Sequence, residues 1–189
     1  TNDLKNRTGQ EVLIDKVSFN WSGRLKFSNF LVFDHHNDTL LFVKDISTSI
    51  EDFRKLNDND FNFDRIETST VFLNIKKYPK EVSNSLNVFL NKLKKSNNKK
   101  RVAFFKSSEI TVSKSRFQYV DLNKARANNI NIKDIDLYAE NFKYQLDSFN
   151  VDLKMLKGVF ESSKSKQFEF IGNVNYSPGT LILPFFDLV

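Results

Sequence analysis

The sequence predicts a mainly β protein built from antiparallel strands, with one or two short helices. Apolar residues alternate with polar ones along most of the 189-residue chain, as they do in strands with one buried and one solvated face. Short polar steps between the apolar runs leave room for hairpin turns but not for crossover helices. Only one internal segment has clear helical spacing, so we expect a sheet to be the main element.

The alternation begins close to the N-terminus. In "VLIDKVSFNW", Val12 and Ile14 are followed, after a longer step, by Val17, Phe19 and Trp21. Strand-like runs then occupy "RLKFSNFLVF" and "TLLFV". Each of these runs has the length of an ordinary strand.

The stretch "FNFDRIETSTVFLNI", residues 61–75, shows the pattern most clearly. Phe61 and Phe63 alternate, and longer steps then restart the alternation at Ile66 and at Val71. Because side chains in a strand alternate with a period of two, we expect a bulge or turn wherever such a step changes the phase.

The same rhythm returns three more times towards the C-terminus, as degenerate repeats rather than copies. The apolar positions in these runs are Ile110, Val112, Phe117 and Tyr119; Ile130, Ile132, Ile135, Leu137, Phe142 and Tyr144; and Phe149, Val151 and Leu153. We therefore expect residues 1–189 to form a single β-rich unit. Because the chain starts without Met and stops at "PFFDLV", we expect it to be a segment of a longer protein.

Helical signals are few. In "NSLNVFLNKLKK", Leu86, Phe89 and Leu90 lie at helical spacing and lysines follow, which predicts a helix over residues 84–95. The following residues, 96–101, read as a basic loop.

Two further segments carry weaker helical signals. Residues 1–8 read as the end of an N-terminal helix closed by Gly9. Residues 51–57 could make one helical turn.

The apolar strand faces allow two architectures. Burying a Phe side chain contributes roughly 1.5–3 kcal/mol, so a chain with 20 Phe must cover these faces with something. In a β-sandwich, two sheets cover each other. In the other arrangement, one long and strongly curved sheet lines an apolar groove. Such a groove would exceed the exposed apolar patch of an ordinary monomer and would need an acyl-chain occupant or partial self-closure.

The composition argues against catalysis. The chain has no Cys and only two His, which excludes disulfides, a thiol nucleophile and a cysteine zinc site. It contains neither a nucleophile elbow nor a glycine-rich phosphate loop. Its formal charge of +6 is interleaved with acidic residues rather than massed on one segment, unlike a typical nucleic-acid binder. We therefore expect no enzymatic activity, no cofactor and no nucleic-acid partner.

The sequence "DHHND" places His35 and His36 between Asp34 and Asp38, and these are the residue types of a metal or catalytic site. A turn between the two flanking strand-like runs explains the segment equally well, because Asp and Asn side chains close turns onto their own backbone. Adjacent residues in a strand point to opposite faces, so both histidines could bind one ion only from an irregular loop. We predict a hairpin turn and no metal.

Residues 8–50, "TGQEVLIDKVSFNWSGRLKFSNFLVFDHHNDTLLFVKDISTSI", closely resemble the N-terminal region of TamB-like proteins of the Bacteroidetes type. These proteins belong to the AsmA-like, bridge-like lipid-transfer group. The resemblance continues through "FNFDRIETSTVFLNIKKY", "NVFLNKL" and "ITVSKSRFQYVD", and fades after about residue 145.

The resemblance implies a long β-sheet folded like a taco, with an apolar groove for phospholipid transport between the inner and outer membranes and a role in outer-membrane biogenesis. It implies a periplasmic location, an inner-membrane anchor through an N-terminal helix missing here, and an outer-membrane barrel partner bound through a missing C-terminal region. The alternative is a β-domain scaffold that binds envelope proteins and transports nothing.

The residues that we expect to line the groove, in contact with phospholipid acyl chains, are in-phase apolar positions. They are Phe19, Leu25, Phe27, Val71, Leu73, Phe117, Tyr119, Ile135, Leu137 and Phe142.

Overall fold

The computed structural model describes residues 9–21, 23–50, 60–96, 104–123, 129–145, 148–161, 166–177 and 180–182. Within these residues the strands are β1 (Val12–Phe19), β2 (Arg24–Phe33), β3 (Thr39–Ile50), β4 (Asp60–Lys77), β5 (Phe104–Asp121), β6 (Ile130–Gln145), β7 (Ser148–Phe160), β8 (Lys166–Ser177) and β9 (Thr180–Ile182). One helix, α2 (Ser85–Ser96), lies between β4 and β5.

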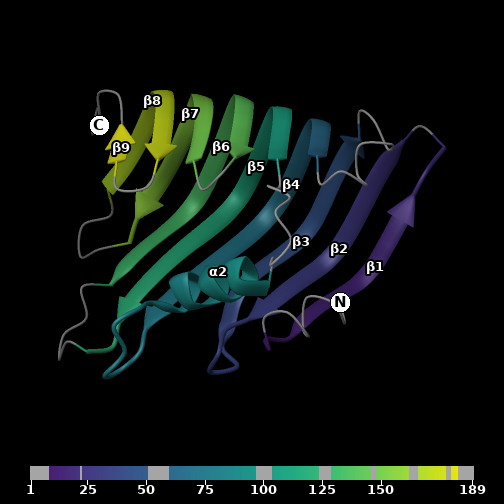
Figure 1. Cartoon of the computed structure of the whole chain (residues 1–189). Coiled ribbons are helices and arrows are strands. Elements are labelled where there is room, and N and C mark those ends of the chain that lie inside the picture. Colours follow the sequence, from purple (N-terminus) through teal and green to yellow (C-terminus); the bar gives the residue numbers. More distant parts are fainter. Residues whose placement is uncertain are drawn as a thin grey trace.

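The described strands form one nine-stranded sheet whose spatial order, β1 to β9, is the order of the sequence. Figure 1 shows this sheet as a continuous layer with β1 at one edge and β9 at the other. The described residues contain no second sheet that faces the first, so the mainly β, curved-sheet prediction is confirmed and the sandwich alternative is not adopted.

One strand pair departs from the expected antiparallel pattern. The neighbouring strands are antiparallel except for β4 and β5, which run parallel from Asp60 opposite Phe104 to Lys77 opposite Asp121. Parallel neighbours need a crossover connection, and α2 lies in that connection. Short polar steps elsewhere in the sequence predicted hairpins correctly, but they did not reveal this crossover.

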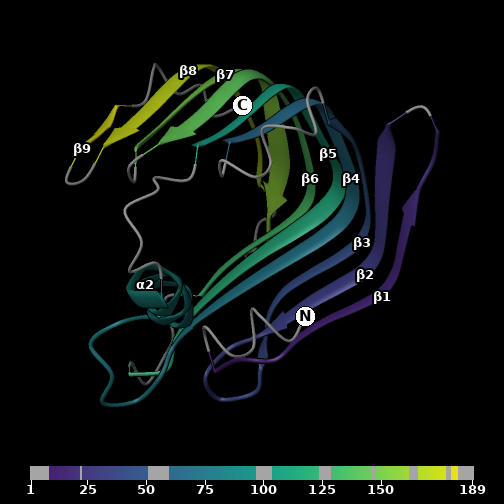
Figure 2. The ribbon, with the colours of Figure 1, turned by 45° about the vertical axis from the view of Figure 1, so that its right-hand side comes forward.

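The strands bend along their length, so that the sheet curls around a concave face (Figure 2). Five non-glycine residues inside strands have left-handed backbone conformations: Asn29 (φ 49°), Thr70 (φ 54°), Lys114 (φ 51°), Asp134 (φ 51°) and Asn141 (φ 55°). The strand register places Asn29, Thr70 and Lys114 at matching positions on β2, β4 and β5, so these residues lie on one line across the sheet. A residue in this conformation interrupts the regular pleat and bends its strand, so this line marks a bend in the sheet.

These left-handed residues occur where the sequence pattern changes phase. Thr70 lies between Thr68 and Val71, and Asp134 lies between Ile132 and Ile135. An additional register shift pairs Thr48 with Ile66 but Ile50 with Phe63. Bulges are therefore confirmed at Asp134 and between Phe63 and Ile66, whereas at Thr70 the phase changes through a left-handed residue without a register shift.

Helix α2 covers one end of the concave face (Figure 2). Leu86 and Phe89 of α2 pack against a buried cluster made by Val12, Val32 and Leu40. The fully buried Ser85 fixes the start of the helix, because its hydroxyl accepts a hydrogen bond of 3.0 Å from the Lys76 backbone N–H of β4. The observed helix lies within one residue of the range 84–95 that the sequence predicts.

Three expected segments lie outside the described residues in whole or in large part. They are the helix end at residues 1–8, the helical turn at 51–57 and the basic loop at 96–101, of which Ser96 ends α2. Among the described residues no helix is long and apolar enough to cross a membrane.

Candidate functional site

The concave face of the sheet carries continuous apolar rows that run from strand to strand. One row consists of residues that lie directly opposite one another on five successive strands: Phe27, Ile46, Thr68, Val112 and Leu137. Opposed residues in neighbouring strands point to the same face, and Leu137 packs against the main apolar cluster of the sheet. Apart from Thr68, the row presents hydrocarbon to the concave side.

The register places all ten predicted lining residues on this same face. Some of them are direct neighbours, such as Leu73 opposite Phe117 and Phe19 opposite Leu25. Others meet apolar residues that were not in the predicted set, since Val71 lies opposite Val43 and Tyr119 lies opposite Ile75. The predicted residues therefore share a face but are spread over β1, β2, β4, β5 and β6 rather than gathered at one point.

These side chains are not sealed in a core. Phe19 retains 58% of its accessible surface, and the other nine are half-buried. Within the described residues, α2 is the only helix that lies over the concave face, and it covers one end of that face, where Leu86 and Phe89 pack against the Val12, Val32 and Leu40 cluster. The concave face therefore carries accessible apolar surface at these ten positions.

The sequence reasoning missed part of this surface. Phe63, Phe105, Phe142 and Phe149 form an aromatic row across β4 to β7, with ring centroids 5.1, 5.6 and 6.3 Å apart in succession. Of these four, the predicted lining residues included Phe142 alone. The closely packed cluster at the β6–β8 end contains five buried side chains, which are Ala139, Val151, Leu153, Phe170 and Val174. The alternation in "QFEF" was a usable signal for Phe170.

Close packing on the concave face also explains why residue 158 is a glycine. A Cβ at Gly158 would lie 3.0 Å from Ile132 Cγ2 and 3.0 Å from two ring atoms of Phe168. A glycine lets the Phe168 ring lie over the backbone of β7.

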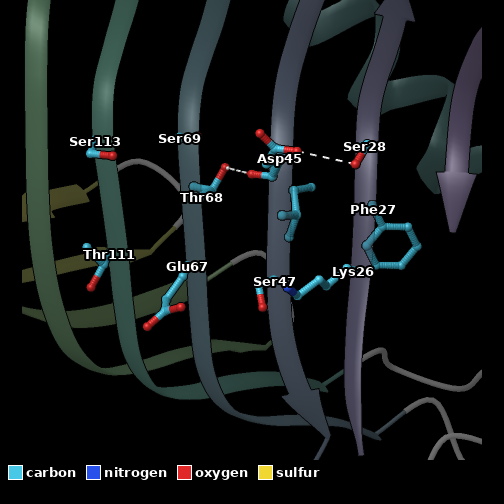
Figure 3. Close-up of a pocket in the computed structure, with 11 residues that line it drawn as sticks. Lys26, Phe27, Ser28, Asp45, Ser47, Glu67, Thr68, Ser69, Thr111 and Ser113 are labelled. Atoms are coloured by element: carbon cyan, nitrogen blue, oxygen red, sulfur yellow. Dashed lines mark hydrogen bonds between the residues drawn. The ribbon is translucent and has the colours of Figure 1, made fainter. Parts of the chain in front are cut away.

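The opposite, convex face is polar over the same part of the sheet. The row that contains Phe27 has a polar row on each side of it, one position away along each strand, so the polar side chains point to the convex face. The two polar rows are Lys26, Ser47, Glu67 and Thr111, and Ser28, Asp45, Ser69 and Ser113. A depression of about 370 Å³ is lined by these residues together with Phe27, Ile46 and Thr68 (Figure 3). The Ser28 hydroxyl donates a hydrogen bond to the Asp45 carboxylate, and a lining of this kind suits water rather than hydrocarbon.

The convex face has one apolar row, on the other side of the bend. Leu13, Leu31, Phe42 and Phe72 lie opposite one another on β1 to β4. The guanidinium of Arg116 lies 5.9 Å from the centre of the Phe72 ring and continues the row onto β5, a cation–π arrangement.

The "DHHND" segment forms the β2–β3 hairpin turn, as predicted. The carboxylate of Asp34 accepts hydrogen bonds from the backbone N–H groups of His36 (2.8 Å) and Asp38 (3.0 Å). The Asp34 N–H donates to the Asp38 carbonyl at 2.8 Å. Asn37 takes the left-handed conformation, with φ 62°. This local bonding explains why Asp34 is buried.

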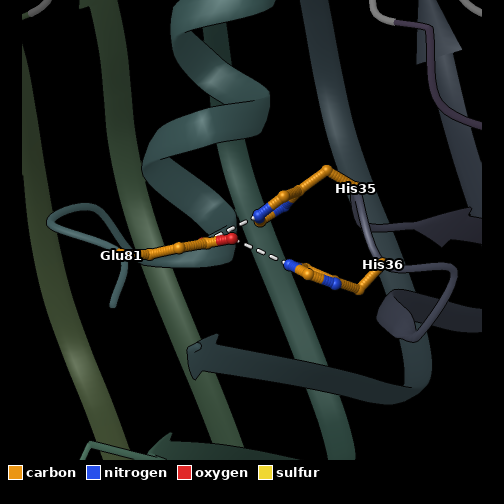
Figure 4. A group of neighbouring side chains, drawn as sticks. All are labelled: His35, His36 and Glu81. Atoms are coloured by element: carbon orange, nitrogen blue, oxygen red, sulfur yellow. Dashed lines mark hydrogen bonds and ion pairs between the residues drawn. The ribbon is translucent and has the colours of Figure 1, made fainter. Parts of the chain in front are cut away.

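The turn also brings both histidines onto one carboxylate, which the sequence did not predict. The Nε2 atom of His35 lies 2.9 Å from Glu81 Oε2, and the Nε2 atom of His36 lies 2.8 Å from Glu81 Oε1 (Figure 4). Glu81 lies in the segment between β4 and α2, more than 40 residues away along the chain. No local spacing could have revealed this contact.

A second layer of contacts holds this cluster in place. The Tyr78 hydroxyl donates to Asp34 Oδ2 at 2.7 Å and lies 2.6 Å from Asp38 Oδ2, so the two carboxylates share its proton. The Lys76 ammonium donates to Asp38 Oδ2 at 2.8 Å. The His36 ring lies over the Tyr78 ring, with centroids 3.8 Å apart.

The electrostatics follow from these contacts. Hydrogen bonds from His36 and then His35 lower the pKa of Glu81, and the hydrogen bond from Lys76, followed by that from Tyr78, lowers the pKa of Asp38. Burial, together with the hydrogen bonds to Asp38 and Asp34, raises the pKa of Tyr78. Near neutral pH Asp38 and Glu81 are therefore ionised and the Tyr78 phenol is neutral.

A scan against models of protein families and a search of curated proteins both returned no match for this chain.

Proposed function

We propose that the concave face binds the acyl chains of phospholipids. In the cell, the chain would form a periplasmic part of a lipid path between the inner and outer membranes and so support outer-membrane biogenesis. In this proposal an N-terminal helix outside this sequence anchors the protein in the inner membrane, and a further C-terminal region contacts the outer-membrane barrel partner.

The observation that carries the proposal is the incomplete burial of the apolar rows. Soluble monomers rarely leave a continuous apolar patch of more than a few hundred Å² in water. Here nine predicted lining residues are half-buried and Phe19 is 58% exposed, on one face of a single sheet. Hydrocarbon on this face would remove the exposed apolar surface from water, with about 25 cal/mol gained for each Å².

The dimensions of the sheet suit this ligand. Strands β4 and β5 have 18 residues each, which at about 3.3 Å per residue gives a path of about 60 Å along a bent strand. An acyl chain that fills half of a ~30 Å bilayer core extends about 15 Å. The concave face can therefore accommodate acyl chains without a closed pocket.

The chemistry of the face also fits lipid transfer. The apolar contacts on the Phe27 row are non-directional, so they do not fix the position of a chain along the face. The described lining residues place no charged side chain in that row. A chain could therefore move along the face without crossing a polar barrier there.

Lipid extraction and native mass spectrometry of the protein, purified without detergent, test the proposal. We expect phospholipid to co-purify and to be displaced by added fatty acid. The scaffold alternative predicts a lipid-free protein that takes up no acyl chain from vesicles. That outcome would contradict the proposed function.

A further inference from the structure

We propose that His35, His36 and Glu81 form a binding site for one divalent transition-metal ion, with Zn²⁺ as the best-suited ion. The site would join the β2–β3 turn to the segment that precedes α2. This inference is independent of lipid binding, and it departs from the expectation of no metal that the sequence supports.

The three donors already converge. The ligand atoms of the two imidazoles and the carboxylate all lie within 4.8 Å of one another. Tetrahedral coordination at 2.0–2.1 Å requires neighbouring donors to be about 3.4 Å apart. The Nε2–O distances of 2.9 and 2.8 Å would therefore need to open by about half an ångström to admit an ion.

The donor set selects the class of ion. Two imidazole nitrogens and one carboxylate oxygen suit Zn²⁺ and its neighbours in the first transition row, whereas Ca²⁺ and Mg²⁺ prefer sites built entirely from oxygen. Three protein ligands leave a fourth position for water. The His36 side chain keeps 44% of its accessible surface and Glu81 keeps 30%, so the ion can enter from solvent.

The surroundings hold the donors in position before any ion binds. Asp34 fixes the backbone on both sides of Asn37 through its hydrogen bonds to the His36 and Asp38 N–H groups. The buried Tyr78 supports the turn through its hydroxyl and contacts both imidazoles, with ring centroids 5.5 Å from His35 and 3.8 Å from His36. Such supporting contacts reduce the ordering cost of binding.

The protonation chemistry is also compatible. In the metal-free protein each Nε2–H donates to Glu81. Metal binding at Nε2 requires a neutral imidazole whose proton lies on Nδ1. The Nδ1 atom of His35 is buried without a hydrogen-bond partner. No hydrogen bond at Nδ1 therefore opposes the transfer of the ring proton from Nε2 to Nδ1.

The formal charge around the site favours a cation. Three carboxylates, from Asp34, Asp38 and Glu81, surround it, and Lys76 supplies a paired ammonium on the Asp38 side. A bound cation would offset the remaining negative charge.

Titration of tag-free protein with ZnCl₂ tests this proposal, with isothermal calorimetry and thermal unfolding as readouts. We expect one ion per chain. At a hundredfold excess over Kd, the melting temperature should rise by about 5–10 °C. Co²⁺ should give a visible absorption band of tetrahedral type, and Ca²⁺ should change neither readout.

Two ligand variants and one control make the test specific. His36→Ala and Glu81→Gln each remove one donor and should weaken Zn²⁺ binding about tenfold or more. Glu169→Gln changes an exposed carboxylate on β8 and should leave binding unchanged. Circular dichroism confirms that each variant is folded before titration.

Two results would overturn the proposal. One is a wild-type protein whose melting temperature does not change with Zn²⁺, which would leave the cluster as a pair of His–Glu hydrogen bonds. The other is equal Zn²⁺ affinity in the wild type and both ligand variants, which would place the binding elsewhere. Neither result would bear on acyl-chain binding, which lipid extraction measures separately.

Discussion

The two faces of the sheet differ sharply between neighbouring rows of residues. The row of Phe27, Ile46, Thr68, Val112 and Leu137 faces the concave side, and the adjacent row of Lys26, Ser47, Glu67, Thr111 and Tyr138 faces the convex side. Residues that are adjacent along each strand therefore lie on different faces, one apolar and the other hydrated. The comparison shows that the register of the strands determines where apolar side chains gather into a continuous surface.

The largest expected effect comes from the packed end of the concave face. Phe170 is 4% exposed and belongs to the main apolar cluster, whereas its neighbour Ile171 is 60% exposed on the other face. Phe170→Ala should lower the free energy of unfolding by about 3–5 kcal/mol. Ile171→Ala should change it by about 0.5 kcal/mol or less. Urea unfolding of both variants measures the difference, and similar losses would mean that the two faces are equally packed.

The second comparison places the same charge on either face of β5. Val112 and Thr111 are adjacent, β-branched and half-buried. Val112→Lys puts an ammonium among acyl chains, at a cost of about 2.5–3.5 kcal/mol, so acyl-chain affinity should fall about a hundredfold. Thr111→Lys lies opposite Glu67 and should leave affinity unchanged. Binding of a fluorescent fatty acid provides the readout, and equal affinities would contradict a concave binding surface.

A third and smaller effect concerns the bend that makes one face concave. Thr70 has a left-handed conformation, which costs a non-glycine residue roughly 1–2 kcal/mol. Thr70→Gly should therefore stabilise the protein by about 0.5–1 kcal/mol after the greater flexibility of glycine is subtracted. Thr68→Gly in the same strand should destabilise it by at least a similar amount, because its hydroxyl donates to the Asp45 carbonyl. Destabilisation by both changes in urea unfolding would argue against strain at Thr70.

The smallest effect should come from the ionic contacts of the hairpin turn. The pKa of Asp38 is lowered from 3.8 by hydrogen bonds from Lys76 and Tyr78. Folded Asp38 thus binds fewer protons than unfolded Asp38, and its contribution to stability is present above about pH 4 and is lost as the pH falls further. The urea midpoint of the wild type should decline in this range.

Two variants isolate this contribution. Asp38→Asn and Lys76→Met should both show a shallower decline of the urea midpoint below about pH 4. A wild-type decline retained in full by Asp38→Asn would assign it to other carboxylates.

Much of the sheet could be predicted because its pattern is local. The changes of phase near Asn29, Thr70 and Asp134 are visible as three-residue steps between apolar positions, and each contains a left-handed residue. The separation of an apolar from a polar face within each strand follows from the same alternation. These features depend on neighbours in the sequence, which is why they could be derived from it.

The remaining features depend on contacts between distant segments. The parallel pairing of β4 with β5 could not be derived, since the alternation of Val71 and Leu73 is the same whichever way the next strand runs. The meeting of Glu81 with His35 and His36 is equally non-local. The sequence places Asp34 and Asp38 beside the two histidines, but nothing in it indicates Glu81 as the carboxylate that meets them.

The agreement between strand order and chain order has a consequence for how the protein folds. Each hairpin strand can add to the strand just before it, so loop closure is short and these steps should be fast. Joining β5 to β4 is different, because the intervening chain with α2 must first bring the start of β5 alongside the start of β4. We expect this single junction to set the refolding rate, with two hairpin ladders forming early on either side of it.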